Sequence, residues 1–171
     1  MEASRLRDLL DAALATLQKF ADRETVTERV DLTESFMSQL FDLGLALGRD
    51  PQDRSSPEFE RFLQESAALL PRAVGDLCLY VVRTENLFYG TWEYDEWKQV
   101  CRRRSTLEFL WELYRETEFS EWFEQIELED LDNLLEERGK REGYLPVEDI
   151  PEGVPRAHWW WWHPEEPPTA A

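Results

Sequence analysis

The N-terminal third of the sequence repeats apolar residues every three or four positions, the spacing that places them on one face of an α-helix. This spacing predicts a first helix over about Ser4–Ala21, in which the Ser4 hydroxyl would cap the first turn. A second stretch predicts a helix that ends at Gly48, because glycine favours the left-handed backbone that often follows a helix. The apolar positions of the two stretches are Leu6, Leu9, Leu10, Ala13, Leu14, Leu17 and Ala21, then Leu32, Phe36, Leu40, Leu43 and Leu47.

The middle of the chain begins with a predicted loop. Residues 48–57 gather glycine, proline, aspartate and serine, which are typical of turns. Ser56 and Pro57 then predict the start of another helix, since a serine cap followed by proline suits a first turn. The apolar run Leu77–Val82 fits either a helix or a buried strand. We predict a helix, because no other segment offers a strand to pair with it.

The region 94–141 contains no proline and predicts two or three further helices, the last ending near Gly139. Its apolar positions are Trp97, Val100, Cys101, Leu107, Leu110, Trp111 and Tyr114, then Phe119, Trp122, Phe123, Ile126, Leu131, Leu134 and Leu135. Beyond residue 143 recurring prolines prevent a regular helix. The sequence therefore predicts an all-α protein: a single-domain bundle of about six or seven helices over residues 1–142, and an extended Pro- and Trp-rich tail over residues 143–171 that packs on the bundle.

The tail places four of the eight tryptophans, Trp159–Trp162, between His158 and His163. Four exposed indoles would form a large hydrophobic surface patch that favours association. We therefore expect the tail to fold back and bury two indoles in a groove of the bundle, while the others pack at its edge or lie partly open. In an extended chain the indoles would alternate between opposite sides. Alternatively, outward indoles grip a protein partner, a sugar or, less readily beside so much negative charge, a membrane surface.

The net charge of −18, from 37 acidic and 19 basic residues, disfavours direct binding to nucleic acid or to an anionic membrane. Halophilic adaptation is a weaker account of this acidity, because glutamate outnumbers aspartate by about two to one. Residues 108–137 hold twelve acidic residues against one basic residue, Arg115. Glu108, Glu112 and Glu116 are spaced to share one helix face. This region is a solvated helix surface, a docking surface for a basic protein, or a source of catalytic or metal-binding carboxylates that no spacing singles out.

The segment Cys101–Arg104 places a thiol beside three arginines. The arginines could lower the pKa of the thiol and make it reactive, or they could bind phosphate. We expect instead that they pair with nearby acidic helices and that Cys101 is buried. With only two cysteines, no metal-type spacing and no signal-peptide pattern, the sequence predicts a cytoplasmic protein. Sixteen arginines against three lysines indicate a GC-rich, bacterial genome.

The sequence contains no phosphate-binding glycine loop and no nucleophile motif. Extended, His158 and His163 would stand about 16 Å apart, too far for one metal ion, so we predict no metal and no cofactor. The first hypothesis is a non-enzymatic adaptor, inhibitor or immunity-type protein that binds a basic protein surface. The alternatives are a nucleic-acid mimic that blocks a DNA- or RNA-binding enzyme, and an enzyme with an unrecognised site. The predicted partner-binding residues are Glu108, Glu112, Glu116, Glu121, Glu124, Trp159, Trp160, Trp161 and Trp162.

Overall fold

The computed structural model describes residues 2–90, 94–142 and 145–162. Within these ranges all regular secondary structure is helical and no strand occurs, which confirms the predicted all-α class. Six of the α-helices found there have 13 or more residues, and a seventh, α6, has 4. None of the helices in the described part is both long and apolar enough to cross a bilayer.

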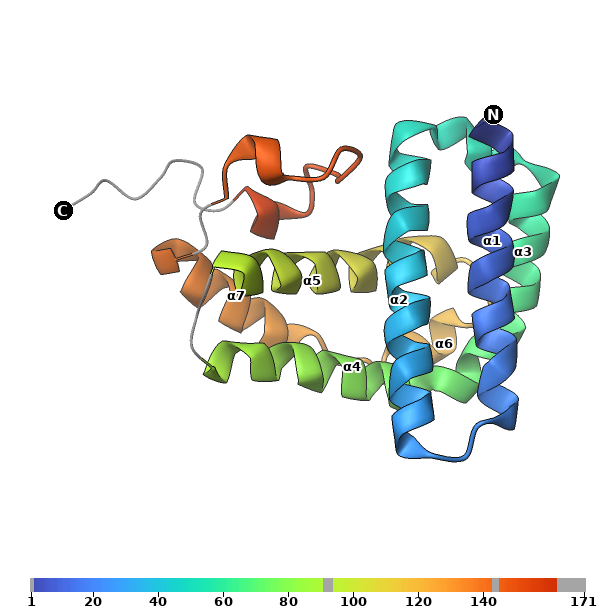
Figure 1. The fold of residues 1–171 in the computed structure, drawn as a ribbon, viewed down its shortest axis with the longest axis horizontal. Helices are drawn as coiled ribbons and strands as arrows, with labels where there is room; N and C mark the ends of the chain where they lie inside the picture. Colours follow the sequence, from blue (N-terminus) through green and yellow to red (C-terminus); the bar gives the residue numbers. More distant parts are fainter. Residues whose placement is uncertain (1, 91–93, 143–144, 163–171) are drawn as a thin grey trace.

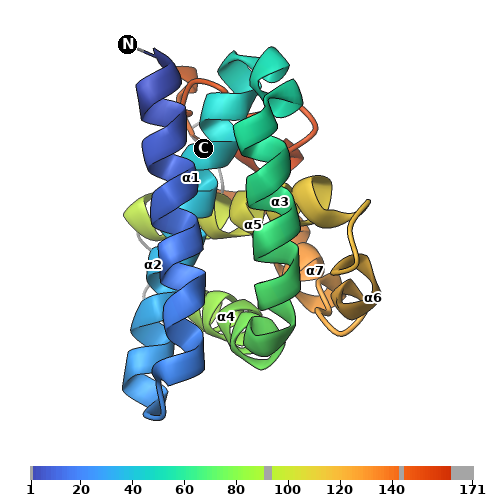
Figure 2. The ribbon, with the colours of Figure 1, turned by 90° about the vertical axis from the view of Figure 1, so that its right-hand side faces the viewer.

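The first three helices form one layer. Helix α1 (Glu2–Lys19) packs on α2 (Val26–Arg49) and on α3 (Pro57–Leu69), and Figure 2 shows the three running roughly side by side. Ser56 caps α3 as predicted, because its Oγ accepts a hydrogen bond from the Phe59 backbone N–H at 3.2 Å. The local sequence therefore sets the start of this helix.

The remaining helices cross this layer. Helices α4 (Val74–Asn86), α5 (Tyr94–Tyr114) and α7 (Glu129–Glu142) run at a steep angle to α2 (Figure 1). The Leu77–Val82 run lies within α4, so the predicted helix is confirmed there. Short α6 (Ser120–Phe123) lies between α5 and α7 in the chain, on the side of the molecule away from α1 (Figure 2).

Helix α5 is the centre of the core. It contacts α2, α3, α4, α6 and the short 3₁₀ helix Trp159–Trp161 of the tail, called here the tryptophan turn. It packs tightly on α2 at Gly44, where a Cβ atom would overlap the ring of Phe109. Its buried apolar residues are Trp97, Val100, Cys101, Leu107, Phe109, Leu110, Leu113 and Tyr114.

Three predicted helix boundaries are wrong. Helix α1 begins at Glu2, so Ser4 lies inside it and is not its cap. Helix α2 continues through Gly48 to Arg49, and α7 continues through Gly139 to Glu142. A glycine is required at position 48 by tertiary packing, because a Cβ atom there would overlap the carbonyl oxygen of Gly153 in the tail.

The described part of the tail, residues 145–162, contains two short 3₁₀ helices, Val147–Asp149 and Trp159–Trp161. It lies along α5, and the tryptophan turn also contacts α7 (Figure 1). Gly153 adopts φ +94°, a conformation that L side chains rarely adopt. The paired glycines at 48 and 153 therefore let the tail pass close to the end of α2.

Candidate functional site

The five predicted partner-binding glutamates do not share one helix face. Glu108 and Glu112 lie on α5, but α5 ends at Tyr114, so Glu116 falls in the turn that follows. Glu121 lies in α6 and Glu124 directly follows α6. The prediction that Glu108, Glu112 and Glu116 share one helix face is therefore wrong, because the helix ends before Glu116.

Glu108 and Glu112 are both engaged by residues of the chain itself. Glu108 Oε2 accepts a hydrogen bond from Arg104 Nη1 at 2.9 Å, and Arg104 also pairs with Asp132 of α7 at 2.6 Å. Glu112 Oε1 lies 3.7 Å from His158 Nε2. The facing His158 imidazole holds the pKa of Glu112 below the ordinary value, against the opposing effect of burial. By contrast, Glu116, Glu121 and Glu124 are exposed.

Glu108 and Glu124 both line an open groove formed by α5, α6 and residues 124–128, the segment that leads to α7. The groove has a volume of about 430 Å³ and is lined by Glu108, Trp111, Ser120, Phe123, Glu124, Ile126 and Leu128. The rings of Trp111 and Phe123 lie with their centroids 5.0 Å apart at an interplanar angle of 53°. Trp111 remains 37% exposed. The groove thus combines accessible aromatic surface with carboxylates.

Sequence reasoning missed the aromatic part of this groove. It assigned Trp111 and Phe123 to the core faces of helices, because both fall at helical spacing from buried neighbours. Phe119, Phe123 and Ile126 were expected to belong to one helix with Leu131, but the chain breaks this segment into α6 and α7. The break at residues 124–128 brings Ile126 and Leu128 to the groove.

The tryptophan tetrad divides into an inner and an outer pair. Trp160 and Trp161 are 2% and 1% exposed, whereas Trp159 is 38% exposed and Trp162 is partly buried. Alternation along an extended chain does not apply, because Trp159–Trp161 form a 3₁₀ turn in which two adjacent indoles enter the core. The Arg104 guanidinium stacks on Trp160, 4.5 Å from the ring centroid.

Both inner indoles converge on one hydroxyl of α5. Trp160 Nε1 and Trp161 Nε1 lie 2.9 and 2.7 Å from Ser105 Oγ, and His158 Nδ1 lies 2.9 Å from the same oxygen. An indole N–H can only donate, so the two indoles take up both lone pairs of the hydroxyl. Ser105 must then donate its own proton to His158 Nδ1. This assigns the imidazole proton to Nε2, which faces Glu112.

The order Ser105, His158, Glu112 matches the nucleophile, base and acid of a hydrolase triad. Ser105 is 0% exposed, however, and its oxygen already accepts from two indoles. A substrate carbonyl cannot reach this oxygen in the packed structure. These three residues therefore hold the tail against α5.

The three consecutive arginines point to three different places, since neighbours on a helix are about 100° apart. Arg102 donates to Ser38 and lies 3.7 Å from Asp42, both on α2. Arg103 pairs with Glu34, also on α2, at 2.6 Å, and Arg104 pairs with Glu108 and Asp132. The expectation that these arginines pair with the nearby acidic helices is confirmed for Arg104, whereas Arg102 and Arg103 pair with carboxylates of α2.

Cys101 is fully buried, also as expected. Its burial raises the pKa of the thiol well above the ordinary value. A low-pKa, reactive thiolate at Cys101 is therefore contradicted.

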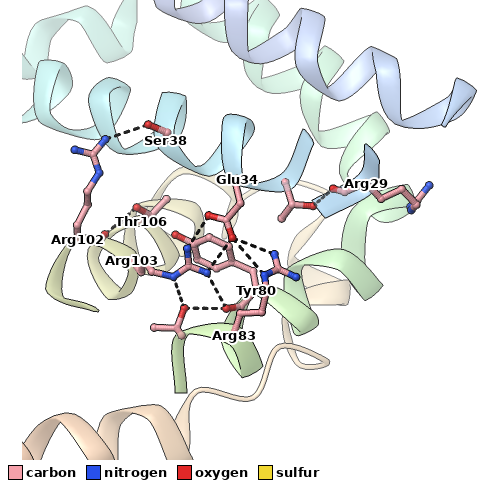
Figure 3. Close-up of polar contacts among 10 residues, drawn as sticks. Arg29, Glu34, Ser38, Tyr80, Arg83, Arg102, Arg103 and Thr106 are labelled. Atoms are coloured by element: carbon pink, nitrogen blue, oxygen red, sulfur yellow. Dashed lines mark hydrogen bonds and ion pairs between the residues drawn. The ribbon is translucent and has the colours of Figure 1, made fainter. Parts of the chain in front are cut away.

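The Arg103 contact belongs to a network that ties α2, α4 and α5 together (Figure 3). Glu34 accepts from Arg103 at 2.6 and 3.1 Å and from Arg83 at 3.3 Å. Arg103 also donates to Thr84 Oγ1 at 2.7 Å, and its guanidinium lies 3.8 Å from the centroid of the Tyr80 ring. Burial of that tyrosine raises its pKa to about 12.

Comparison with known proteins gives no match: no protein-family model, no curated protein and no solved structure is significantly similar to this chain.

Proposed function

We propose that this protein is a non-enzymatic interaction module that binds the basic surface of a protein partner through the groove formed by α5, α6 and residues 124–128. The observation that carries the proposal is the groove itself, where exposed Trp111 and partly buried Phe123 line the same space as Glu108 and Glu124. Tryptophan in a pocket that a partner can fill is a preferred source of binding energy.

Charge supports the same partner chemistry. Glu116, Glu121 and Glu124 are exposed in or beside α6, and the whole chain carries −18. A field of this sign raises the association rate of a basic protein and repels nucleic acid. Trp160 and Trp161 are buried where the tail packs on the helices. We therefore propose that the partner binds at the groove and that these two indoles only stabilise the fold.

The test compares two triple variants that each remove three negative charges. One changes the groove side through Glu116→Gln, Glu121→Gln and Glu124→Gln. The other changes exposed positions on α1, α3 and the loop before α2. Its substitutions are Asp8→Asn, Glu24→Gln and Glu60→Gln.

The immobilised wild-type protein is first used to capture basic proteins from a cell extract, and the association rate of a captured protein is then measured for all three forms. At low salt the groove-side variant should associate about ten-fold more slowly than wild type, and the control much less so. The difference should shrink as ionic strength rises. Equal slowing by both variants, or capture of no basic protein, contradicts the proposal. Displacement of the captured protein by DNA would favour the nucleic-acid mimic instead.

A further inference from the structure

We propose that the groove is an arginine-recognising site. A guanidinium from a basic segment of the partner stacks on Trp111 and donates hydrogen bonds to the carboxylates of Glu108 and Glu124. This inference rests on the proposed function and deepens it, since it names the side chain that the groove receives.

The fold itself shows which side chain suits this kind of environment. At five places within the described residues, an arginine stands over an aromatic ring and also pairs with a carboxylate. The pairs of arginine and ring are Arg29 on Phe20, Arg83 on Tyr80, Arg102 on Phe41, Arg103 on Tyr80 and Arg104 on Trp160. The carboxylates are those of Asp76 for Arg29, Glu34 for Arg83 and Arg103, Asp42 for Arg102, and Glu108 and Asp132 for Arg104.

Two of these combinations are seen in Figure 3, where Arg83 and Arg103 both reach Glu34 beside Tyr80. The combination is physically favourable because a guanidinium is planar. Its face can lie on a ring while its N–H groups point outward in the plane to carboxylate oxygens.

The groove presents the same two components to solvent. Trp111 supplies a partly exposed ring, and Glu108 and Glu124 line the same space. In the part of the chain that the structure describes, no arginine stacks on Trp111 or Phe123 and no cation pairs with Glu124. Glu108 gives only Oε2 to Arg104. A guanidinium from outside therefore completes the arrangement that the chain makes five times for itself.

Arginine is favoured over lysine at such a site. A lysine ammonium carries the same charge, but it is a compact, strongly hydrated group that cannot lie flat on an indole while donating to two carboxylates. General attraction to the acidic face would not distinguish the two side chains. Selectivity for arginine over lysine is thus the property that separates this site from a merely acidic surface.

The experiment uses two synthetic peptides of equal length and charge, one of arginine and glycine and the other of lysine and glycine. Their dissociation constants are measured by calorimetry against the full chain. The variants are Trp111→Leu and Trp111→Tyr, with Trp122→Leu as the control. Trp122 is similarly exposed, at 39%, but does not line the groove. Melting curves show whether each variant is folded.

The arginine peptide should bind about five-fold more tightly than the lysine peptide, the factor that corresponds to an exposed cation–π contact. Trp111→Leu should abolish this preference by weakening the arginine peptide alone, Trp111→Tyr should retain most of it, and Trp122→Leu should leave both constants unchanged. Equal binding of the two peptides by wild type overturns the arginine site, and so does a preference that survives in Trp111→Leu. If the groove-side glutamate variant still loses binding in that case, the proposed function stands without the arginine site. Binding of neither peptide overturns the inference as well.

Discussion

The Ser105 hydroxyl lies 2.9 Å from Nδ1 of His158, a residue 53 positions further along the chain. This contact holds the tail on α5. Because Ser105 Oγ also accepts hydrogen bonds from the Trp160 and Trp161 indoles, its own proton is donated to His158. A single hydroxyl thus satisfies three buried polar groups. Removal of that hydroxyl should affect stability more than the loss of one ordinary hydrogen bond.

Ser105→Ala should lower the free energy of unfolding by about 2–4 kcal/mol, since it leaves buried donors and a buried acceptor without a partner. Trp160 keeps a second acceptor, the Cys101 carbonyl oxygen at 3.1 Å, which limits the loss. Urea unfolding followed by circular dichroism measures the change. Ser38→Ala, at an exposed serine bonded to Arg102, is the control and should change stability by less than about 0.5 kcal/mol. A similar small effect of both substitutions would contradict the role of Ser105.

Deletion of residues 156–171 should lower the melting temperature by many degrees, because it removes the two buried indoles of the tetrad. Replacing one core tryptophan with alanine costs about 3–5 kcal/mol. Within the tetrad, Trp161→Ala should therefore destabilise the protein far more than Trp159→Ala, whose side chain is 38% exposed. If the truncated chain melts like the full-length protein, the tail does not stabilise the bundle.

Gly48→Ala should destabilise the protein by about 1–3 kcal/mol, because its new methyl group would meet the Gly153 carbonyl oxygen and displace the tail. Gly75→Ala in α4 is the matched control, since a Cβ there meets nothing within 4 Å. That substitution should leave stability unchanged or raise it by about 0.4–1 kcal/mol, through a less flexible unfolded chain. Thermal melting of the two variants distinguishes a packing effect from a helix-propensity effect. Equal changes in melting temperature for the two variants would indicate an effect of helix propensity alone.

Glu112→Gln should change how stability depends on pH. The folded pKa of Glu112 lies below its ordinary value of 4.5, chiefly because His158 faces it. The stability contributed by the carboxylate is therefore fully present above pH 4.5 and is lost as pH falls through the folded pKa. Unfolding free energies of wild type and variant should differ most above pH 4.5 and converge in more acidic solution. A difference that stays constant across this range would show that the contact with His158 does not set the pKa of Glu112.

The all-α class and most of the helices follow from the sequence alone. The 3.6-residue apolar spacing identified α1 and α2, and Ser56 marked the first turn of α3, because these features depend on interactions within a few residues. The spacing left α4 open between helix and strand, and the helix was predicted because no other segment offered a strand to pair with it. The CRRR segment was also interpretable from sequence. Arginines and a surplus of acidic residues pair wherever a compact fold brings them together.

Which residues face solvent depends instead on how the helices and the tail pack together. Gly48 does not end α2, but its lack of a side chain lets the tail pass close by. Trp160 and Trp161 are both buried because they lie in a 3₁₀ turn, which the local sequence spacing does not reveal. Glu108 and Glu112 look equivalent to Glu116 in the sequence, yet Arg104 and His158 engage the first two. Trp111 of α5 and Phe123 of α6 line one groove because the chain turns between α5 and α6. Such relationships join residues far apart in the chain, so they depend on how whole segments pack and not on the residues that surround each position.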